Sequence, residues 1–578
     1  MAHWSENSAR LKLRTSRVGE IKQLKNLSPG PSMVTVLWLP KILSAYDGNC
    51  GASYEEIALL ANRLDKSATL CVVATPPDAA ALLPFLQKSL KFQMWIAVKT
   101  VRAPKGSAKS LPARHVSLLI LTRYKSALRH VPTRIKYTFC PACGKTTKDY
   151  GGKKHVYHRY GTLMSDVWTD TDCDPGKNIR AVTRRLRDMF GLSPYKHLLL
   201  VDLRRCKELV QRRRNSDARK LKSKKVKVVP VTIRSRLINK DCTQALKSLR
   251  SDSIDFCFAD LPYNLNKRYY RCKDSLEEEE YFAWCNEWLS ELHRVLKPGR
   301  TLAVLNVPQW AAKHFLFLAS IMDFQTWIVW DALGFPSRKI MPAHYAILCF
   351  SKGIPRALPG MGSAAGNGSE KNYLRQRAKF YCVRGACVKK RRLLGERDQT
   401  NLSDIWSDVH RLTHNSRRVS HPCQLPPLLM RRLFSLFTKR KEVILDCVNG
   451  AGTSTLVAEE IERRYIGIEL SRRYHNLALK RHRLLKIREN PFISNNGTPT
   501  SKNSPVERLP KRKYKVSKKE LQLEVKRIAD TLGRMPKRED VEKLGTYSIR
   551  YFDQYFVSWA EACGAARAAT LSRTATTN

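Results

Sequence analysis

The residues best suited to chemistry stand where a run of apolar residues ends in an acid. In the segment SIDFCFADLPYNLN, an apolar run reaches Asp260, which Leu261, Pro262 and Tyr263 follow. The exocyclic amine of a nucleic-acid base is a poor nucleophile, because its lone pair is delocalised into the ring. Asp260 can accept one amine hydrogen and the carbonyl of Leu261 the other, while Tyr263 stacks on a base turned out of its helix. The alternative is an ordinary strand-to-loop turn with a capping aspartate.

A second candidate site is the segment VILDCVNGAGTSTLVAEEIERRYIGIEL. Its pattern predicts a strand, a turn containing Gly450 and Gly452, a helix, and a second strand ending at Glu469. Glycines let a ligand approach the backbone, and a helix N-terminus offers free N–H groups. Glu469 stands 17 residues after Gly452, near the spacing of about 20 at which an acid binds a ribose diol. The third glycine of a dinucleotide fingerprint is replaced by Thr455, which favours S-adenosylmethionine over a pyrophosphate cofactor.

A third segment, HPCQLPPLLMRRLFSLF, begins at His421 and precedes the glycine turn. Its prolines predict a break in the chain ahead of an amphipathic helix. His421 and Gln424 are then placed to contact the amino-acid end of a cofactor. The alternative is a helix start without a ligand.

The order of these three segments resembles the β-class amino DNA methyltransferases, which carry a [DNS]PP[YFW] tetrad, an HPTQKP-like segment and a DPFxGxGTT-like loop in that order. The resemblance covers about residues 237–485. It implies methyl transfer from S-adenosylmethionine to the exocyclic amine of adenine or cytosine in DNA. It implies a catalytic tetrad of Asp260, Leu261, Pro262 and Tyr263. It implies cofactor contacts from Asp241, His421, Gln424, Asp446, Asn449, Gly450, Gly452, Thr453 and Glu469.

The chain departs from the family pattern in places that bear on the target base. Leu261 stands where a proline is usual, and Cys447 and Asn449 stand where Pro and Ala or Gly are common. The acid at the first tetrad position favours adenine N6, because serine is typical of the cytosine-amine enzymes. Cytosine-N4 methylation, RNA methylation and a methyltransferase-like nucleic-acid-binding protein without catalysis remain as alternatives.

The composition points to a polyanionic partner. The chain has 578 residues, 105 Lys and Arg against 50 Asp and Glu, and a net charge of +55. Its 43% of hydrophobic residues excludes a mostly disordered protein. The positive excess predicts a nucleic-acid partner, and the resemblance implies DNA. No apolar run approaches the ~20 residues that cross a bilayer, and no secretory signal opens the chain. We therefore expect no membrane partner and a cytoplasmic, nucleoid-associated protein.

The cysteines predict a metal site. Sixteen cysteines in an unsecreted chain indicate reduced thiols rather than a disulfide framework. Cys140 and Cys143 have the C-x₂-C spacing that zinc favours, and Cys382 and Cys387 hold the corresponding place in the second half. Four thiolates from the two halves predict a closed structural zinc site. Unliganded thiols are the alternative, and competing ligands lie nearby in the sequence, namely His155, His158 and Cys173.

The two halves of the chain indicate an internal duplication. TLCVVATP matches TLAVLNVP, PARHVSLLILTRYKS matches PAHYAILCFSKG, and LMSDVWTD matches LSDIWSDV, in the same order. The first copy has lost the chemistry. Trp38-Leu39-Pro40-Lys41 stands where the tetrad belongs, and HLLLVDLRRCKELV, which has no glycine, stands where the turn belongs. We expect this copy to bind DNA or to maintain a dimer-like arrangement within a monomer.

These patterns predict an α/β fold of two Rossmann-like methyltransferase units with mainly parallel sheets, plus a small C-terminal helical module. The module resembles the helical repeats associated with homing endonucleases, and its Lys and Arg are expected to contact phosphates. The stretch 353–370 is expected to be a solvated loop. The expected boundaries are a degenerate domain at 12–215, a basic linker at 216–232, the catalytic domain at 233–488, a linker at 489–513 and the module at 514–570.

Overall fold

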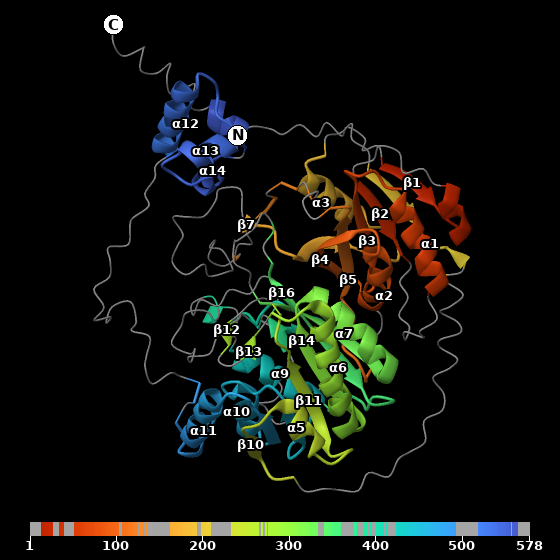
Figure 1. The fold of residues 1–578 in the computed structure, drawn as a ribbon, viewed down its shortest axis with the longest axis vertical. Helices are drawn as coiled ribbons and strands as arrows, with labels where there is room; N and C mark the ends of the chain where they lie inside the picture. Colours follow the sequence, from red (N-terminus) through yellow and green to blue (C-terminus); the bar gives the residue numbers. More distant parts are fainter. Residues whose placement is uncertain are drawn as a thin grey trace. The chain divides into compact units, whose positions relative to one another are not determined.

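The computed structural model contains two large sheets and a group of C-terminal helices (Figure 1). The first compact unit holds both sheets and comprises Met1–Thr133, Ser165–Ala378 and Asp398–Thr498; the second comprises Arg134–Met164, Lys379–Arg397 and Pro499–Asn578. No helix among the described residues is long and apolar enough to cross a membrane. The structure describes residues 13–26, 34–39, 51–102, 107–124, 162–192, 198–207, 233–264, 275–332, 342–359, 399–409, 424–489, 518–556 and 558–564, with shorter pieces between them.

The sheet of the second half contains eight strands. They are β10 (Arg236–Ile238), β11 (Ile254–Asp260), β14 (Leu296–Asn306), β15 (Asp323–Asp331), β16 (His344–Ser351), β19 (Ile405–Trp406), β20 (Val443–Asp446) and β21 (Arg464–Ile468). Their spatial order is β10-β21-β20-β11-β14-β16-β15-β19. The first five run parallel, and β16 is antiparallel to both of its neighbours.

Helices cover both faces of this sheet, which is why its central strands are apolar runs rather than alternating ones. All residues of β11 except the last are buried. Cys257 and Ala259 face α5 (Cys242–Lys247), α6 (Glu278–Val295) and α7 (Pro308–Ile321). Phe256 and Phe258 face α9 (Pro427–Phe437) and α10 (Thr453–Glu460). The alternation of strand side chains thus serves two separate cores.

The sheet of the first half contains seven strands in the order β1-β9-β2-β3-β5-β4-β8. The helical elements of this half are η1 (Ile21–Asn26), α1 (Gly51–Asn62), α2 (Pro76–Gln87) and α3 (Arg180–Phe190). The strands are β1 (Leu13–Arg17), β2 (Val34–Trp38), β3 (Thr69–Ala74), β4 (Lys91–Thr100), β5 (His115–Thr122), β8 (Val167–Cys173) and β9 (Leu198–Asp202).

The two sheets repeat one topology except at one place. β1, β2, β3, β5, β4 and β8 correspond to β10, β11, β14, β16, β15 and β19, and β5, like β16, is antiparallel to both neighbours. Only β9 stands between β1 and β2, whereas β20 and β21 stand between β10 and β11. The described first sheet therefore lacks a strand beside the position of the glycine turn. The two sheets confirm two Rossmann-like units, the first of them degenerate.

Residues at corresponding positions join the two sheets in a reciprocal way. Nδ1 of His115, which begins β5, lies 2.7 Å from a carboxylate oxygen of Asp404 in the second half. Nδ1 of His344, which begins β16, lies 3.2 Å from a carboxylate oxygen of Asp166 in the first half. All four residues are buried. Each half thus offers the same histidine and the same aspartate to the other, as the two subunits of a symmetric dimer do.

Aromatic and helical contacts follow the same twofold relation. Trp95 of β4 stacks on Trp327 of the corresponding strand β15, with ring centroids 5.1 Å apart and planes 12° apart. Helix α2 lies against its counterpart α7. The interface buries a core between the two sheets, so the internal pseudo-dimer is a packed unit and not two tethered domains.

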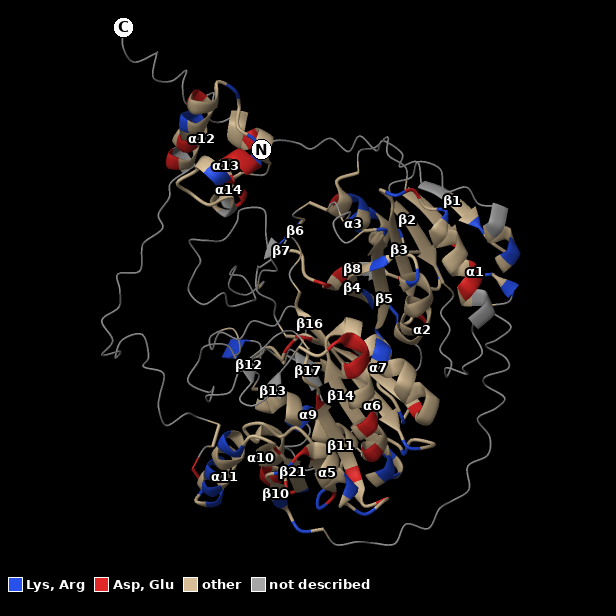
Figure 2. Ribbon diagram, in the orientation of Figure 1, with Lys and Arg blue, Asp and Glu red and all other residues tan. Residues whose placement is uncertain are grey.

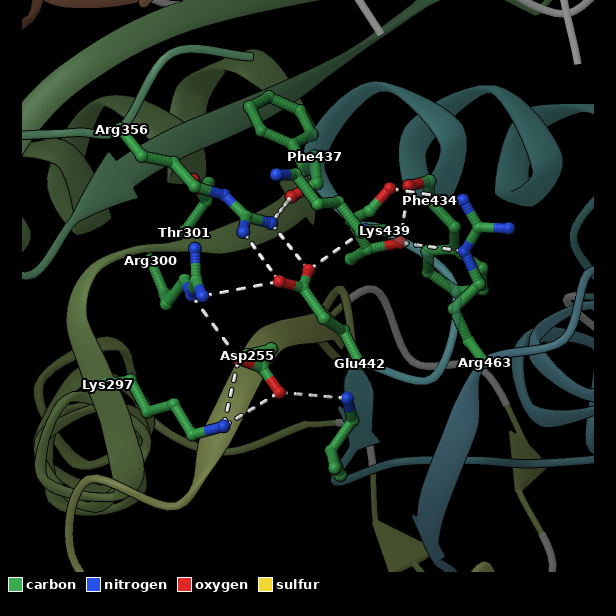
Figure 3. Close-up of polar contacts among 12 residues, drawn as sticks. Asp255, Lys297, Arg300, Thr301, Arg356, Phe434, Phe437, Lys439, Glu442 and Arg463 are labelled. Carbon is green, nitrogen blue, oxygen red and sulfur yellow. Dashed lines mark hydrogen bonds and ion pairs between the residues drawn. The ribbon is translucent and has the colours of Figure 1, made fainter. Parts of the chain in front are cut away.

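A cluster of charged residues fixes the amino ends of the central strands of the second sheet (Figure 3). Asp255 of β11 accepts hydrogen bonds from Nζ of Lys297 at 2.9 Å and from the N–H of Val443 at 3.0 Å. Arg356 donates two hydrogen bonds of 2.6 Å to Glu442. Burial alone would raise the pKa of Glu442, but the hydrogen bonds and charge of Arg356 lower it overall. The cluster ties β11, β14 and β20 together at the edge opposite Asp260.

The C-terminal helices have a core of their own. They are α12 (Lys518–Leu532), α13 (Arg538–Leu544) and α14 (Ile549–Tyr555). The aromatic side chains serve this core: Phe552 and Phe556 are buried in it, and Tyr547 and Trp559 pack against it.

The stretch 353–370 begins with exposed, irregular residues as expected, but it is not solvated throughout, because Leu358 is buried. Leu358 is 2% exposed, and its N–H donates to the carbonyl of Ala108 at 2.7 Å. Burying a leucine side chain is worth about 1.5–3 kcal/mol, and here it outweighs the loop preference of the surrounding Gly and Pro. Residues 360–370 and the linker 216–232 lie outside the described residues.

Candidate active site

The tetrad and the glycine turn share one edge of the second sheet. β11 and β20 are neighbouring parallel strands, and Phe258 pairs with Asp446. Asp260 ends β11 two residues further on. With strands about 4.8 Å apart and a rise of about 3.3 Å per residue, the Cα atoms of Asp260 and Asp446 are roughly 8 Å apart. The carboxyl ends of neighbouring strands form the crevice in which open α/β sheets bind ligands.

Within the tetrad, the acid and the aromatic residue are bonded to each other. The hydroxyl of Tyr263 donates to Oδ1 of Asp260 at 2.9 Å. Tyr263 is 4% exposed, and the centroid of its ring lies 5.6 Å from that of Tyr345. Nε1 of Trp310 donates to the carbonyl of Tyr263 at 2.9 Å. The tetrad is therefore a packed turn with a fixed backbone, and not a loose loop.

A buried chain of polar side chains supports the tetrad. The hydroxyl of Tyr281 donates to the carbonyl of Pro262 at 2.6 Å, and Nδ2 of Asn306 donates to that hydroxyl at 3.1 Å. Nδ2 of Asn306 also lies 3.3 Å from Nε2 of His314. Burial lowers the pKa of His314 to about 3, so its ring is neutral and Nε2 can accept.

This series of hydrogen-bonded side chains, Tyr281, Asn306 and His314, was not predicted from the sequence. The available signal was the end of the run TLAVLN, which places Asn306 at the carboxyl end of the strand beside β11. A polar residue at that edge is a candidate for the site in any open α/β sheet.

The glycine turn has the conformation that its glycines allow. Gly450 and Gly452 have φ of 52° and 82°, in the left-handed region. A methyl group on Gly452 would lie 2.8 Å from Cβ of Ala478 in α11 (Arg472–Lys486). Asn449 holds the turn from inside, because its Oδ1 accepts a hydrogen bond from the hydroxyl of Thr455 at 3.1 Å. The strand, turn and helix expected from the sequence are confirmed as β20, the turn and α10.

Two buried acids flank the turn. The carboxylate of Glu469 accepts the N–H of Gly450 at 2.8 Å and that of Ser471 at 2.7 Å. Burial raises the pKa of Glu469, although these two hydrogen bonds act against the rise. Burial also raises the pKa of Asp446, to about 6, against a hydrogen bond from the hydroxyl of Ser454. Both acids sit where a nucleoside cofactor would be held.

This set of donors and acceptors fits S-adenosylmethionine. Backbone N–H groups fix the Glu469 carboxylate just past β21, and each of its oxygens has a second lone pair for a ribose hydroxyl. Gly450 and Gly452 present bare backbone, and α10 begins beside them at Thr453. Glu469 would hold the ribose and the turn would hold the amino-acid end.

The other predicted cofactor residues differ in how well the structure places them. Asp241 lies just past β10, which pairs with β21, and its carboxylate caps α5 by accepting the N–H of Gln244 at 3.2 Å. Gln424 is buried just before α9. His421 lies outside the described residues. Contacts of these three residues with a cofactor remain predictions.

The corresponding place in the first sheet is filled by side chains. Trp38 ends β2 and pairs with Asp202 of β9. The guanidinium carbon of Arg204 lies 3.6 Å from the centroid of the Trp38 ring. Arg204 also donates to both carboxylate oxygens of Asp202, at 2.9 and 2.8 Å. A cation–π contact and an ion pair thus stand where the second sheet has its acid and its glycine turn.

Comparison with known proteins agrees with this geometry. Residues 254–480 match the family model described as DNA methylase. This segment is therefore similar to the DNA methylases, and it contains the tetrad, the glycine turn and Glu469. A second family model, the homing endonuclease associated repeat, matches residues 516–566, which confirms the resemblance of the C-terminal module.

Two curated proteins that are similar to the chain are named as type II methyltransferases. The chain is 30% identical to M.BamHI of Bacillus amyloliquefaciens over 243 residues, which are 41% of this chain and 54% of that protein. It is 29% identical to M.HpaI of Haemophilus parainfluenzae over 255 residues, 43% of this chain and 73% of that protein. The match thus spans about half the length of M.BamHI.

Solved structures of methyltransferases also align with the chain. The PvuII DNA methyltransferase, titled cytosine-N4-specific, has 18% identity and a TM-score of 0.30, with 46% of this chain and 88% of that chain covered. The M1.HpyAVI–SAM complex has 16% identity and a TM-score of 0.28, with 43% and 98% covered.

The predicted zinc ligands are described in part. Cys140 and Cys387 are buried, and their Sγ atoms lie 3.9 Å apart. Within the part of the chain that the structure describes, no group of three or more metal-binding side chains occurs. Of the other candidates, Cys173 is buried at the end of β8, and four lie outside the described residues, namely Cys143, Cys382, His155 and His158.

Proposed function

We propose that this protein is an S-adenosylmethionine-dependent DNA methyltransferase that modifies the N6 amine of adenine. The observation that carries the proposal is the placement of Asp260 and the glycine turn at the ends of neighbouring strands β11 and β20. The DNA methylase match supports the reaction class. The acid at the first tetrad position supports adenine. Cytosine N4 is the second candidate, because the matched family covers both amines.

The chemistry assigned to the tetrad is activation of a weak nucleophile. S-adenosylmethionine supplies a methyl group on a sulfonium, and the carbon–sulfur electrons pass to sulfur as the amine lone pair attacks. Asp260 accepts one amine hydrogen and the carbonyl of Leu261 the other, which draws the lone pair out of the ring. Asp260 then accepts the proton that the methylated nitrogen loses. The tetrad turn, fixed by Trp310 and Tyr281, holds these acceptors in place.

Binding of the base has to rearrange the resting tetrad. The Tyr263 hydroxyl donates to Oδ1 of Asp260, so an amine that uses this oxygen replaces that hydrogen bond with its own. The ring of Tyr263 is buried in the resting structure, so base binding also has to uncover it before it can stack on the extruded base. The resting contact keeps the carboxylate oriented before the substrate arrives, which lowers the cost of ordering it on binding.

Basic residues beside the cofactor turn provide a surface for DNA. Helix α11 packs on the turn through Ala478 and is blue along its outer face in Figure 2. Its exposed basic residues are Arg472, Arg473, Lys480, Arg483 and Lys486. Phosphate contacts of this kind give affinity that falls steeply with salt. The C-terminal module and the degenerate first half add further basic surface. We also propose a nucleoid-associated role in restriction-modification.

The proposal is tested by incubating the full chain with methyl-labelled S-adenosylmethionine and unmethylated DNA, followed by nucleoside analysis. We expect labelled N6-methyladenine. Labelled N4-methylcytosine would show instead that the target is the second candidate, cytosine N4. Label in RNA alone, or no label despite tight DNA binding, would overturn the proposal.

The role of the acid is tested with Asp260→Asn. We expect methyl transfer to fall about 10²–10⁴-fold, the usual contribution of a positioned acid or base, while S-adenosylmethionine binds within about twofold of the parent affinity. Asp323→Asn, at the exposed start of β15, is the matched control with the same change of charge and should keep activity.

A further inference from the structure

Five polar side chains connect the glycine turn to helix α11. They are called the turn support here and are Asn449 in the turn, Thr455 and Glu459 of α10, Tyr465 of β21 and His482 of α11. Helix α10 packs against both α11 and β21 (Figure 1). Glu459 is partly exposed, and the other four residues are buried. The methyl transfer described above uses the turn but assigns no role to the histidine.

Both ring nitrogens of this histidine face oxygen atoms. His482 is 5% exposed. Its Nδ1 is hydrogen-bonded to the carboxylate of Glu459, and its Nε2 lies 3.0 Å from Oγ1 of Thr455. The ring of Tyr465 stacks on the imidazole with centroids 4.7 Å apart, and its hydroxyl donates to the same carboxylate at 3.2 Å. The imidazole is therefore held in one orientation.

The hydroxyl of Thr455 has one hydrogen, and the turn offers two acceptors for it. Oδ1 of Asn449 lies 3.1 Å from Oγ1, and the carbonyl oxygen of Gly452 lies 3.2 Å from it. A hydroxyl that donates to the turn can only accept from His482, so Nε2 carries a proton. Nδ1 faces a carboxylate, which is an acceptor, so Nδ1 carries a proton as well. The hydrogen-bond partners thus assign the ring as an imidazolium.

The groups around the ring agree with this assignment. Burial alone would raise the pKa of Glu459, but the hydrogen bond and charge of His482 lower it overall, and Lys486 adds to the lowering. Burial raises the pKa of Tyr465, so its hydroxyl stays neutral. Strand β10 also packs against α11, and its charged residue Arg236 is exposed. The charged group in contact with the ring is thus a carboxylate, which can accept from an imidazolium.

We propose that the protonation state of His482 directs the Thr455 hydroxyl and so couples the affinity of the glycine turn for its cofactor to pH. When Nε2 loses its proton it becomes an acceptor, and the hydroxyl turns its hydrogen from the turn to the ring. Asn449 then loses one of the hydrogen bonds that join it to α10, and the cofactor has to order a looser turn on binding. Cofactor affinity therefore falls as the ring is deprotonated. We take the ligand of the turn to be S-adenosylmethionine, so this step rests on the proposed function.

The test compares cofactor affinity on both sides of the histidine titration, at about pH 6 and pH 9. Calorimetry with S-adenosylhomocysteine, the stable product of the proposed reaction, gives the ratio of the affinities at the two pH values. The amine of the ligand also titrates in this range, but it does so equally in every variant. We expect the affinity of the parent to fall about three- to tenfold more than that of variants in which the hydroxyl cannot turn, the value of about one hydrogen bond.

Two variants remove the coupling in opposite directions. Thr455→Val lacks the hydroxyl, so it should bind about three- to tenfold more weakly than the parent at pH 6 and equally at pH 9. His482→Phe lacks the competing acceptor, so it should match the parent at pH 6 and bind more tightly than the parent at pH 9. Thr455→Ser keeps the hydroxyl, and His475→Phe makes the same change at a half-buried histidine of the same helix, so both should keep the parent ratio. Weaker binding by His482→Phe at both pH values would indicate a purely structural role and overturn the proposal.

A measurement without cofactor separates this coupling from the proposed function. Hydrogen exchange at pH 6, followed by mass spectrometry, reports how firmly the turn is held. We expect the amides of the turn to exchange about three- to tenfold faster in Thr455→Val and like the parent in Thr455→Ser. Unchanged exchange in Thr455→Val would overturn the coupling. A parent that shows this exchange pattern but binds no S-adenosylhomocysteine would overturn the proposed function and not the coupling.

Discussion

Replacing Gly452 by alanine tests whether the cofactor turn depends on close packing. The new methyl would lie 2.8 Å from Cβ and 3.3 Å from Cα of Ala478, at a φ of +82°. A left-handed residue with a Cβ costs about 1–2 kcal/mol, and overpacking costs about 1–3 kcal/mol more. We expect Gly452→Ala to lower the free energy of unfolding by about 2–5 kcal/mol.

A matched control separates the two costs. Gly353 has a φ of +70°, and a methyl added there meets nothing within 4 Å. Gly353→Ala therefore carries only the backbone cost of about 1–2 kcal/mol, and the difference between the variants measures the overlap with Ala478.

The assay is urea unfolding followed by tryptophan fluorescence, with S-adenosylmethionine affinity measured by calorimetry. Moving the turn away from Ala478 displaces the backbone that would contact the cofactor. We expect affinity to fall at least about tenfold in Gly452→Ala, a cost of about 1.4 kcal/mol, and to stay within twofold in Gly353→Ala. Equal destabilisation of the two variants, with cofactor affinity unchanged in both, would refute the packing argument.

Three further changes test the electrostatics and the support of the site. Burial raises the pKa of Asp446 to about 6, so its contribution to the free energy of unfolding is complete below about pH 4 and is lost as pH rises through 6. Asp446→Asn should therefore flatten the fall in melting temperature between pH 4.5 and 7.5. An unchanged pH profile of the melting temperature would contradict the raised pKa of Asp446. The pKa of Glu442 is lowered, so its contribution to the free energy of unfolding is present above the pKa of the unfolded chain and is lost in acid. Glu442→Gln should therefore lower the melting temperature at pH 7 but much less at pH 3. An equal loss of melting temperature at both pH values would speak against the ion pair with Arg356. Tyr281→Phe removes the hydrogen bond to Pro262 and should reduce kcat about tenfold with little change in S-adenosylmethionine affinity, as measured by steady-state kinetics, whereas a loss confined to stability would indicate a purely structural role.

The parts of the site that follow from local patterns could be predicted from the sequence. The strand at Val443–Asp446, the helix from Thr453 and the acid at the end of β11 are where the apolar runs and glycines indicate. These signals are local, because a strand must end where its apolar run ends and a left-handed turn needs glycine.

Contacts between distant segments could not be predicted in the same way. The hydrogen bond of Tyr281 with Asn306 joins residues on α6 and β14 whose sequences read as ordinary core. The pair of His115 and Asp404 spans 289 residues. The duplication did hint at it, because His344 and Asp166 stand at the matching places. No local pattern shows which buried polar residue a distant one will meet.

The reciprocal pairing of the two sheets has a consequence for the order in which the strands of a DNA target would be methylated. Two copies joined as one polypeptide always stay together, so either copy could lose its catalytic residues while the interface persisted. In the first copy, Arg204 and the ring of Trp38 fill the place of the catalytic residues, so this is the copy that lacks them. If the protein methylates DNA as proposed, its single tetrad and glycine turn, in the second copy, would methylate one strand at each encounter with a duplex. A symmetric target would first be methylated on one strand and would need a second encounter for the other strand. An asymmetric target would be fully methylated after the first encounter.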